Sequence, residues 1–443
     1  MTATNLEVRF DTSLPILATM IIESLSLDVE KDGYFLRDGF GRVAFYSFKS
    51  ITKKELSTFN VKALRALGNS CFPAGAIQIA PGDTPVGDAV IWKAMRAGPH
   101  DLTIQLVDRR FSGRDWLSRP RAPIPGAPPM ITFGSLKGGV GRTTALFVLA
   151  MFLARQGRNV LLVDLDLEAP GLASMVFRQD EMPRFGALEY LVETSLNGIC
   201  DDQLHDFIGT SSLTDRDRGQ GRVDLLPATG KETLSCAHTM MAKLARALIE
   251  RPSPTGPISL AVQIRQMVER FASTSDYDVV LIDARAGLAE LTAGPLLGLG
   301  STVLLFGTDH PHTFEGYRYL MGHLGLLPTT EGEPDWREQI HFVHAKASTK
   351  PESLVAFNDK LYDVLSEAFY ETDISEDVFN FSLNDQESPH HAWVIYHDSQ
   401  FLDSEYLADP ASFDGPILEA VFSDFLGRAY NILNLPAFGL RTI

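Results

Sequence analysis

A glycine-rich octapeptide constrains this chain more than any other feature. The sequence KGGVGRTT occupies residues 137–144; it follows an apolar run at 130–133 and precedes a helix-like run at 144–153. Its three glycines allow successive backbone N–H groups to turn inward, and the N-terminus of the following helix adds the positive end of its dipole. The octapeptide therefore predicts a phosphate-binding loop between a β-strand and an α-helix.

The cation of this loop departs from the general P-loop pattern. In G-x-x-x-x-G-K-S/T, the lysine reaches the β- and γ-phosphates and the hydroxyl that follows it binds Mg²⁺. Here Leu136 stands at the first glycine, Arg142 stands at the lysine, and an additional lysine, Lys137, begins the loop. Thr143 keeps the hydroxyl that the pattern uses for magnesium.

The loop resembles the deviant Walker A motif of the ParA/MinD ATPases, K-G-G-x-G-K-T-T, and is more similar still to a ParA-like branch that carries K-G-G-V-G-R. The resemblance covers residues 130–345. It implies an α/β fold, a doubly wound, mostly parallel sheet of the P-loop NTPase type, with ATP and Mg²⁺ as ligands. It also implies a homodimer in which Lys137 reaches across an ATP sandwich to the partner's nucleotide.

The first carboxylates of such a site follow the apolar run 160–163, which is typical of a buried parallel strand. Asp164 and Asp166 stand at its end. The resemblance assigns Asp166 to the orientation of the attacking water. For Asp164 two roles stay open: a magnesium ligand, or a cap of the turn after the strand.

A second apolar run, at 279–282, also ends at a carboxylate, Asp283. This segment resembles Walker B followed by switch II, so Asp283 is expected to hold Mg²⁺ and the backbone N–H of Gly287 to meet the γ-phosphate. MinD-like chains read D-S-P-A-G here, whereas this chain has Arg285 before Ala286. Arg285 either senses phosphate or pairs with surface carboxylates.

The site predicted from the sequence is therefore the following. The catalytic residues are Lys137 and Asp166, and the magnesium ligands are Thr143, Asp164 and Asp283. The nucleotide-binding residues are Lys137, Gly138, Gly139, Val140, Gly141, Arg142, Thr143, Thr144 and Gly287.

Arg142 affects turnover more than binding. A guanidinium remains charged and grips phosphate oxygens bidentately, but its planar fork cannot occupy the place of an ammonium. The expected activity is therefore weak ATP hydrolysis in a dimerising molecular switch that controls a partner protein or complex, in partitioning, regulation or defence. The alternative is a scaffold or adaptor that binds nucleotide without hydrolysing it. A small-molecule kinase or ligase would need an acceptor pocket, which the sequence does not indicate.

Composition narrows the class of protein. The 443 residues are 45% hydrophobic, and no apolar run reaches the roughly 18 residues of a membrane helix. Acidic residues precede the apolar run 14–22, which argues against a secretory signal and predicts a cytoplasmic protein. Cys71, Cys200 and Cys236 form no C-x-x-C pair, which disfavours a disulfide framework and the branches of the family that carry iron–sulfur clusters.

A net charge of −17 weighs against general DNA binding, because DNA is held chiefly by lysine and arginine. Residues 109–121 hold five arginines with Phe111 and Trp116 between them, which would suit single-stranded nucleic acid or a nucleotide. The favoured interpretation is a domain edge whose aromatics pack inside and whose arginines either snorkel to solvent or pair with Asp108 and Asp115. The terminal helix is too acidic for anionic lipid, so no membrane partner is expected.

Five prolines between residues 119 and 130 predict a stiff linker. The predicted domains are an N-terminal α+β recognition or coupling domain at 1–118, the linker at 119–129, the ATPase domain at 130–345, and a C-terminal extension at 346–443 packed on the ATPase domain. The N-terminal domain is expected to bind a protein partner. The predicted helices lie at 53–67, 234–250, 259–272, 311–326, 352–370 and 416–433. The predicted strands outside the motifs lie at 42–48, 102–107, 223–226, 302–306, 340–343 and 392–396.

Overall fold

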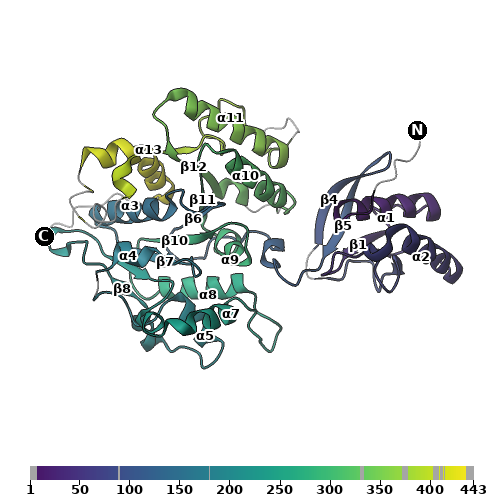
Figure 1. Cartoon of the computed structure of the whole chain (residues 1–443), viewed down its shortest axis with the longest axis horizontal. Coiled ribbons are helices and arrows are strands. Elements are labelled where there is room, and N and C mark those ends of the chain that lie inside the picture. The colour runs from purple at the N-terminus through teal and green to yellow at the C-terminus, as the bar shows by residue number, and fades with distance from the viewer. Residues whose placement is uncertain are drawn as a thin grey trace. The chain divides into compact units, whose positions relative to one another are not determined.

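The computed structural model describes residues 7–87, 90–178, 180–329, 334–371, 378–402, 409, 413 and 415–435. The chain divides into two compact units (Figure 1). Unit 1 comprises Met1–Arg119 with Gly325–Pro328, and unit 2 comprises Pro120–Leu324 with Thr329–Ile443. The domain boundaries drawn from the sequence stay predictions, and residues 436–443 of the C-terminal extension lie outside the described residues.

Unit 1 is a mixed sheet covered by two helices. Within the described residues its five strands lie in the order β3-β2-β1-β5-β4. Their bounds are β1 Gly33–Arg37, β2 Val43–Ser47, β3 Ile77–Ile79, β4 Val90–Ala97 and β5 His100–Asp108. The helices are α1, Phe10–Leu25, and α2, Lys53–Leu67. Alternate residues of β1 and β5, such as Phe35 and Leu106, pack against these helices in one core.

Local sequence explains why α2 could be predicted and α1 could not. Thr52 caps α2, since its hydroxyl accepts from the backbone N–H of Glu55 while the Glu55 carboxylate accepts from the backbone N–H of Thr52. The predicted helix at 53–67 is confirmed, as are strands at 42–48 and 102–107. Helix α1 contains Pro15 and has no hydrophobic period as clear as that of α2, so its position was missed.

Unit 2 contains one long sheet. The described residues give eight strands in the order β13-β12-β11-β6-β10-β7-β9-β8, and all neighbours are parallel except β8 and β9. The bounds are β6 Met130–Ser135, β7 Val160–Asp164, β8 Gly209–Thr210, β9 Val223–Leu226, β10 Val279–Ala286, β11 Thr302–Gly307, β12 Ile340–Ala347 and β13 Trp393–Tyr396. The predicted fold class, a mostly parallel α/β sheet with a separate α+β domain, is confirmed.

Helices cover both faces of this sheet (Figure 1). Within β7, Val160 and Leu162 pack with α3 and α13, whereas Leu161 and Val163 pack with α5 and α8. Burial on both faces explains why the strand is a continuous apolar run. The bounds are α3 Arg142–Arg155, α4 Leu172–Val176, α5 Ala187–Thr194, α6 Lys231–Ser235, α7 Met240–Ala247, α8 Leu260–Ala272, α9 Glu290–Ala293, α10 Pro311–Leu324, α11 Pro351–Ala368 and α13 Pro416–Leu433.

Two features of unit 2 differ from the sequence prediction. The helix predicted at 234–250 is two helices, α6 and α7, because Cys236 leaves the helical region of the backbone at φ −121° and ψ 50°. The chain beyond residue 345 also continues the main sheet, since β13 pairs in parallel with β12 and α13 packs into the same core. Within the described part of the chain, every helix is too short or too polar to cross a bilayer.

Candidate functional site

Sheet topology brings the three sequence motifs to one edge. Strand β10 lies between β6 and β7, and all three are parallel, so their carboxyl ends meet there. Asp283 in β10 is in register with Asp164 at the end of β7 and with Phe133 in β6. The loop between β6 and α3 begins at this edge. This is the place where open α/β sheets bind their ligands.

The loop conformation requires glycine at two places. Gly139 has φ 75°, and Gly141, the residue before α3, has φ 93°. A Cβ atom at Gly139 would meet nothing within 4 Å, so the requirement there is the backbone angle and not the space. Gly287 also has a positive φ, 97°, and its N–H donates to the carbonyl of Ser135 at 2.9 Å. The amide of Gly287 therefore has a partner within the fold.

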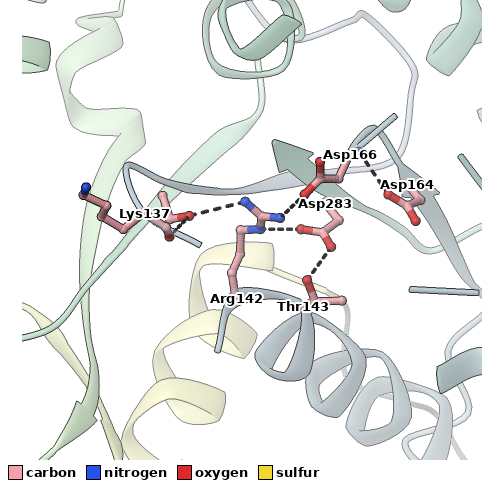
Figure 2. Close-up of polar contacts among 7 residues, drawn as sticks. Lys137, Arg142, Thr143, Asp164, Asp166 and Asp283 are labelled. Carbon is pink, nitrogen blue, oxygen red and sulfur yellow. Dashed lines mark hydrogen bonds and ion pairs between the residues drawn. The ribbon is translucent and has the colours of Figure 1, made fainter. Parts of the chain in front are cut away.

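The Arg142 guanidinium lies on carboxylates (Figure 2). Its Nε donates to Oδ1 of Asp283 at 2.5 Å, and its Nη2 donates to Oδ2 of Asp166 at 3.0 Å. A third nitrogen, Nη1, is 3.3 Å from Oγ of Ser135. The side chain is 8% exposed, so these charge-assisted bonds are little screened. Arg142 thus joins the strand ends of β6 and β10 to the segment after β7.

Three aspartates form the acidic side of the site. Asp164 is fully buried, and its Oδ1 accepts from the backbone N–H of Asp166 at 3.0 Å. Both Oδ atoms of Asp283 have donors, because Oδ2 accepts from the Thr143 hydroxyl at 2.7 Å. By contrast, Oδ2 of Asp164 and Oδ1 of Asp166 are buried and have no hydrogen-bond partner among the described residues. The site therefore holds unused oxygen lone pairs that point to a missing donor or cation.

Burial raises the pKa of Asp164 well above its ordinary value, and the negative charge of Asp283 raises it further. Burial also raises the pKa of Asp283, although the Arg142 charge and the hydrogen bonds from Thr143 and Arg142 oppose that shift. Arg142 is consequently the group that keeps this buried acidic pair compatible with the fold.

The donor set fits magnesium. Mg²⁺ prefers hard oxygen ligands and is usually held by one or two carboxylates together with phosphates and water. The Thr143 hydroxyl, Asp283 and the unpartnered oxygens of Asp164 and Asp166 are such ligands.

Lys137 lies apart from this network. It is exposed, and its ammonium has no hydrogen bond or ion pair with any described residue. Figure 2 shows its side chain pointing away from Arg142 and the aspartates. The Ser135 hydroxyl donates to the Lys137 carbonyl at 3.0 Å, which holds the start of the loop.

A cavity of about 520 Å³ opens beside the loop. This volume is within the range of ligand sites, roughly 300–1,000 Å³. One wall is the loop with Arg142, Thr143 and Asp166. The other wall comes from the chain after residue 344: Ala345, Lys346, Ile395, Tyr396, His397, Asp398, Phe401, Val421 and Phe422. The apolar part of this wall suits a flat ring and the polar part suits its edge atoms.

Sequence reasoning missed Ser135, Lys346 and the whole second wall. Ser135 ends an apolar strand, and the second wall follows β12 and β13, whose neighbours in the sheet the sequence did not reveal. Of the two roles left open for Arg285, phosphate sensing and pairing with a carboxylate, the structure favours pairing, since Nη1 of Arg285 lies 2.5 Å from Oε1 of Glu168. Arg285 therefore pairs with a carboxylate of the segment that follows β7.

The two aromatic side chains of the arginine-rich segment 109–121 differ in burial. Trp116 is buried, whereas Phe111 is 77% exposed. Arg110 pairs with Asp108 at 2.8 Å, in agreement with the favoured interpretation of a domain edge. Phe111 does not pack inside, which is the part of that interpretation that was wrong.

Part of this chain is similar to known proteins. Residues 129–327 match the AAA_31 family model, described as an AAA domain. The chain is 26% identical over 180 residues to the iron-sulfur cluster carrier protein of Salmonella typhimurium, covering 40% of this chain and 47% of that one. It is 29% identical over 201 residues to the chromosome-partitioning ATPase Soj of Thermus thermophilus, covering 45% and 61%.

The chain spans about half the length of the first of these curated relatives. A solved structure, the ParA family ATPase from Chlorobium tepidum TLS, aligns with a TM-score of 0.44 and 16% identity over 69% of this chain and 99% of that one. The family match begins at the strand before the glycine-rich loop and includes the ends of β7 and β10. The part of the chain that holds the glycine-rich loop and the ends of β7 and β10 is therefore similar to a family of AAA domains and to a chromosome-partitioning ATPase.

Proposed function

We propose that this protein is an ATP- and Mg²⁺-dependent switch that dimerises with nucleotide, hydrolyses ATP slowly and thereby controls a partner protein. One observation carries the proposal. A glycine loop at a helix N-terminus, two strand-end carboxylates with unpartnered oxygens and a cavity of about 520 Å³ meet at a single edge of the sheet. This combination supports binding of a nucleoside triphosphate.

Each group at the edge has a role in this proposal. The loop amides from Gly138 to Thr144 bind phosphate oxygens, and Thr143 with Asp283 holds the metal. Asp166 orients the attacking water, and Asp164 supplies a further oxygen beside the metal. Mg²⁺, when bound, neutralises charge that develops on the transferred phosphoryl group.

Arg142 accounts for slow turnover. Its guanidinium is directed to Asp283 and Asp166, so it does not supply a preorganised charge at the phosphate. The loss of one preorganised donor elsewhere costs on the order of 10²–10³-fold in rate. The same observation favours the second candidate, a scaffold that binds ATP without turnover, because Arg142 also occupies the carboxylate that would orient water.

Lys137 supports the dimer. A lysine that begins a phosphate loop, is exposed and has no partner among the described residues is available to a nucleotide held by a second copy. One relative is named an iron-sulfur cluster carrier protein. The cysteines of this chain do not favour that role, since Cys71, Cys200 and Cys236 are far apart in the sequence and Cys71 is buried in unit 1.

Unit 1 offers a surface for the protein partner. Phe10, Phe40 and Phe111 are 58%, 76% and 77% exposed. The ring centroids of Phe40 and Phe111 are 5.2 Å apart, and these two side chains form an exposed aromatic cluster. The Phe10 ring lies beside Gly41, the residue after Phe40, since a Cβ atom at Gly41 would be 3.2 Å from it. Exposed aromatic clusters mark protein interfaces.

A protein is favoured over nucleic acid because two of the neighbouring arginines are paired with carboxylates. Arg42 pairs with Asp38 at 2.7 Å and Arg110 pairs with Asp108. A photo-crosslinking amino acid at position 40 should therefore capture a protein in cells. Crosslinks to nucleic acid instead would contradict this part of the proposal.

The decisive experiment measures molar mass in solution without nucleotide and with ADP, ATP or a non-hydrolysable ATP analogue. ATP should produce a dimer that Lys137→Ala abolishes and the matched variant Lys350→Ala retains, since Lys350 is also exposed but lies outside the glycine-rich loop. A molar mass that changes neither with nucleotide nor with Lys137→Ala would refute the switch. Phosphate release by Asp166→Ala then separates the candidates, because a scaffold should show no difference from the wild type.

A further inference from the structure

We propose that Lys346, and not Arg142, provides the cation that binds the nucleotide phosphates within the same subunit. The inference rests on the proposed function, since it assigns a residue for the phosphates of that ligand. Neither a loop motif nor a position near the aspartates marks Lys346 in the sequence. Tertiary structure brings it to the loop from the end of β12, more than 200 residues away in the chain.

The Arg142 side chain is already hydrogen-bonded to protein groups. Three of its nitrogens have acceptors on Asp283, Asp166 and Ser135, and the side chain is 8% exposed. If the guanidinium turned to phosphate, it would leave two carboxylates without their counterion beside the buried Asp164. Breaking a buried ion pair from one side is strongly unfavourable. Arg142 therefore remains with the aspartates, and the loop needs another cation for the phosphates.

Lys346 already contacts the loop. Its ammonium donates to the carbonyl oxygen of Gly139 at 2.7 Å, and its Cε would lie 3.8 Å from a Cβ atom at Gly141. It lines the cavity, whereas Lys137 does not. Among the described lining residues, Arg142 and Lys346 are the two with a permanent positive charge. A phosphate oxygen that entered the loop would be a stronger acceptor than the carbonyl, because both partners of that bond would be charged.

The backbone at Lys346 is specialised for this position. Lys346 has φ 54°, which is rare for a residue with a side chain. The other described non-glycine residues with positive φ, Ser26 and Asn434, both end helices, where a left-handed residue is common. Lys346 instead lies inside a strand. Strain without a capping role is typical of ligand sites.

A β-bulge gives the geometric cause. The register of β12 with β13 shifts between His344 and Ala347, so that Ala345 and Lys346 oppose Ile395 alone. A bulge of this kind re-aims a side chain next to a site. The extra residue in β12 directs the lysine toward the loop. The bulge, the positive φ and the contact with Gly139 are separate observations that agree on one role.

The test is a set of nucleotide titrations on the full chain, with ATP, ADP and AMP as ligands. Lys346→Gly removes the ammonium but suits a positive φ, so the variant should fold and melt no lower than the wild type. Its affinity for ATP should fall by about 10- to 100-fold, and its affinity for AMP should change little, because the lost bonds are to the outer phosphates. Lys350→Gly, at an exposed lysine outside the cavity, is the matched control for loss of charge in the same segment.

Three other results would overturn the inference. Equal ATP affinity in the wild type and Lys346→Gly would exclude a phosphate contact. Equal losses for ATP and AMP with a lower melting temperature would mean that Lys346 only fastens the loop. If Arg142→Gln, and not Lys346→Gly, reduced the ratio of ATP to AMP affinity, the phosphate cation would be Arg142. A wild type that bound no nucleotide would instead refute the proposed function itself.

Discussion

The two units of this protein differ in net charge and in whether they bury charged side chains. Residues 1–119 contain 15 Lys and Arg against 13 Asp and Glu, whereas residues 120–443 contain 24 against 43. Unit 2 buries charged groups at the edge of its sheet, where Asp164, Asp283 and Arg142 are all less than a tenth exposed. Unit 1 instead exposes an aromatic cluster at its surface. The net charge of −17 thus belongs to unit 2 and says little about what unit 1 binds.

This difference has a structural origin. A parallel sheet covered on both faces leaves only the strand ends for a site, and polar groups there are partly desolvated. The sheet of unit 1 has helices on one face, and its aromatic cluster comes from loops. Chemistry in unit 2 therefore depends on a few buried charges, while recognition by unit 1 would depend on exposed area.

The largest expected effect is that of Arg142→Met. Removing the shared counterion of Asp166 and Asp283 should destabilise unit 2 by about 3–5 kcal/mol, because two carboxylates are left unpaired in a buried place. Hydrogen exchange of peptides from β6 and β10 measures this loss, and peptides from β1 and β5 report unit 1 in the same experiment. Arg109→Met, at an exposed arginine of unit 1, should cost less than about 0.5 kcal/mol. Comparable losses of stability in Arg142→Met and Arg109→Met would contradict this difference between the two units.

A smaller effect is expected from pH. Burial, together with the nearby Arg428 charge, lowers the pKa of His341 to about 4, so the folded state keeps this side chain neutral. The unfolded chain binds its proton near pH 6.5. The contribution of His341 to the free energy of unfolding is therefore fully present above pH 6.5. It is lost as the pH falls toward 4, and the loss is on the order of 3 kcal/mol.

His341→Gln should remove this share of the acid sensitivity of unit 2, as read from urea denaturation between pH 7 and pH 4. Burial also lowers the pKa of His344, His390 and His391, so some slope should remain in the variant. Unit 1 has a single histidine, the exposed His100, so the free energy of unfolding of unit 1 should not show this dependence on pH. An unchanged slope in His341→Gln would show that this side chain is protonated in the folded state.

The smallest effect on stability is expected from Phe111→Ala. The ring is 77% exposed, so its removal should change the free energy of unfolding by less than about 1 kcal/mol. ATP affinity and ATP-dependent dimerisation should not change, because the residues of the candidate site all lie in unit 2. Mass measurement with and without ATP checks this outcome. A lost dimer would mean that the two units do not divide recognition from chemistry.

Local patterns in the sequence determined much of this protein. The glycines at 138, 139 and 141, the apolar run of β7 and the carboxylates after it are sufficient to predict a phosphate loop and a parallel sheet, because each pattern reflects a backbone or burial requirement of its own segment. The capping pair Thr52 and Glu55 marks α2 in the same way.

Tertiary structure alone decided which partners these residues meet. Arg142 could face phosphate or carboxylate, and it faces Asp283, a residue 141 positions later in the chain. Lys346 reaches the loop because β12 bulges against β13, and the second wall of the cavity comes from the last strand and helix that the structure describes. Such contacts depend on strand order and register, which arise from the packing of whole elements and leave no signal at the residues themselves.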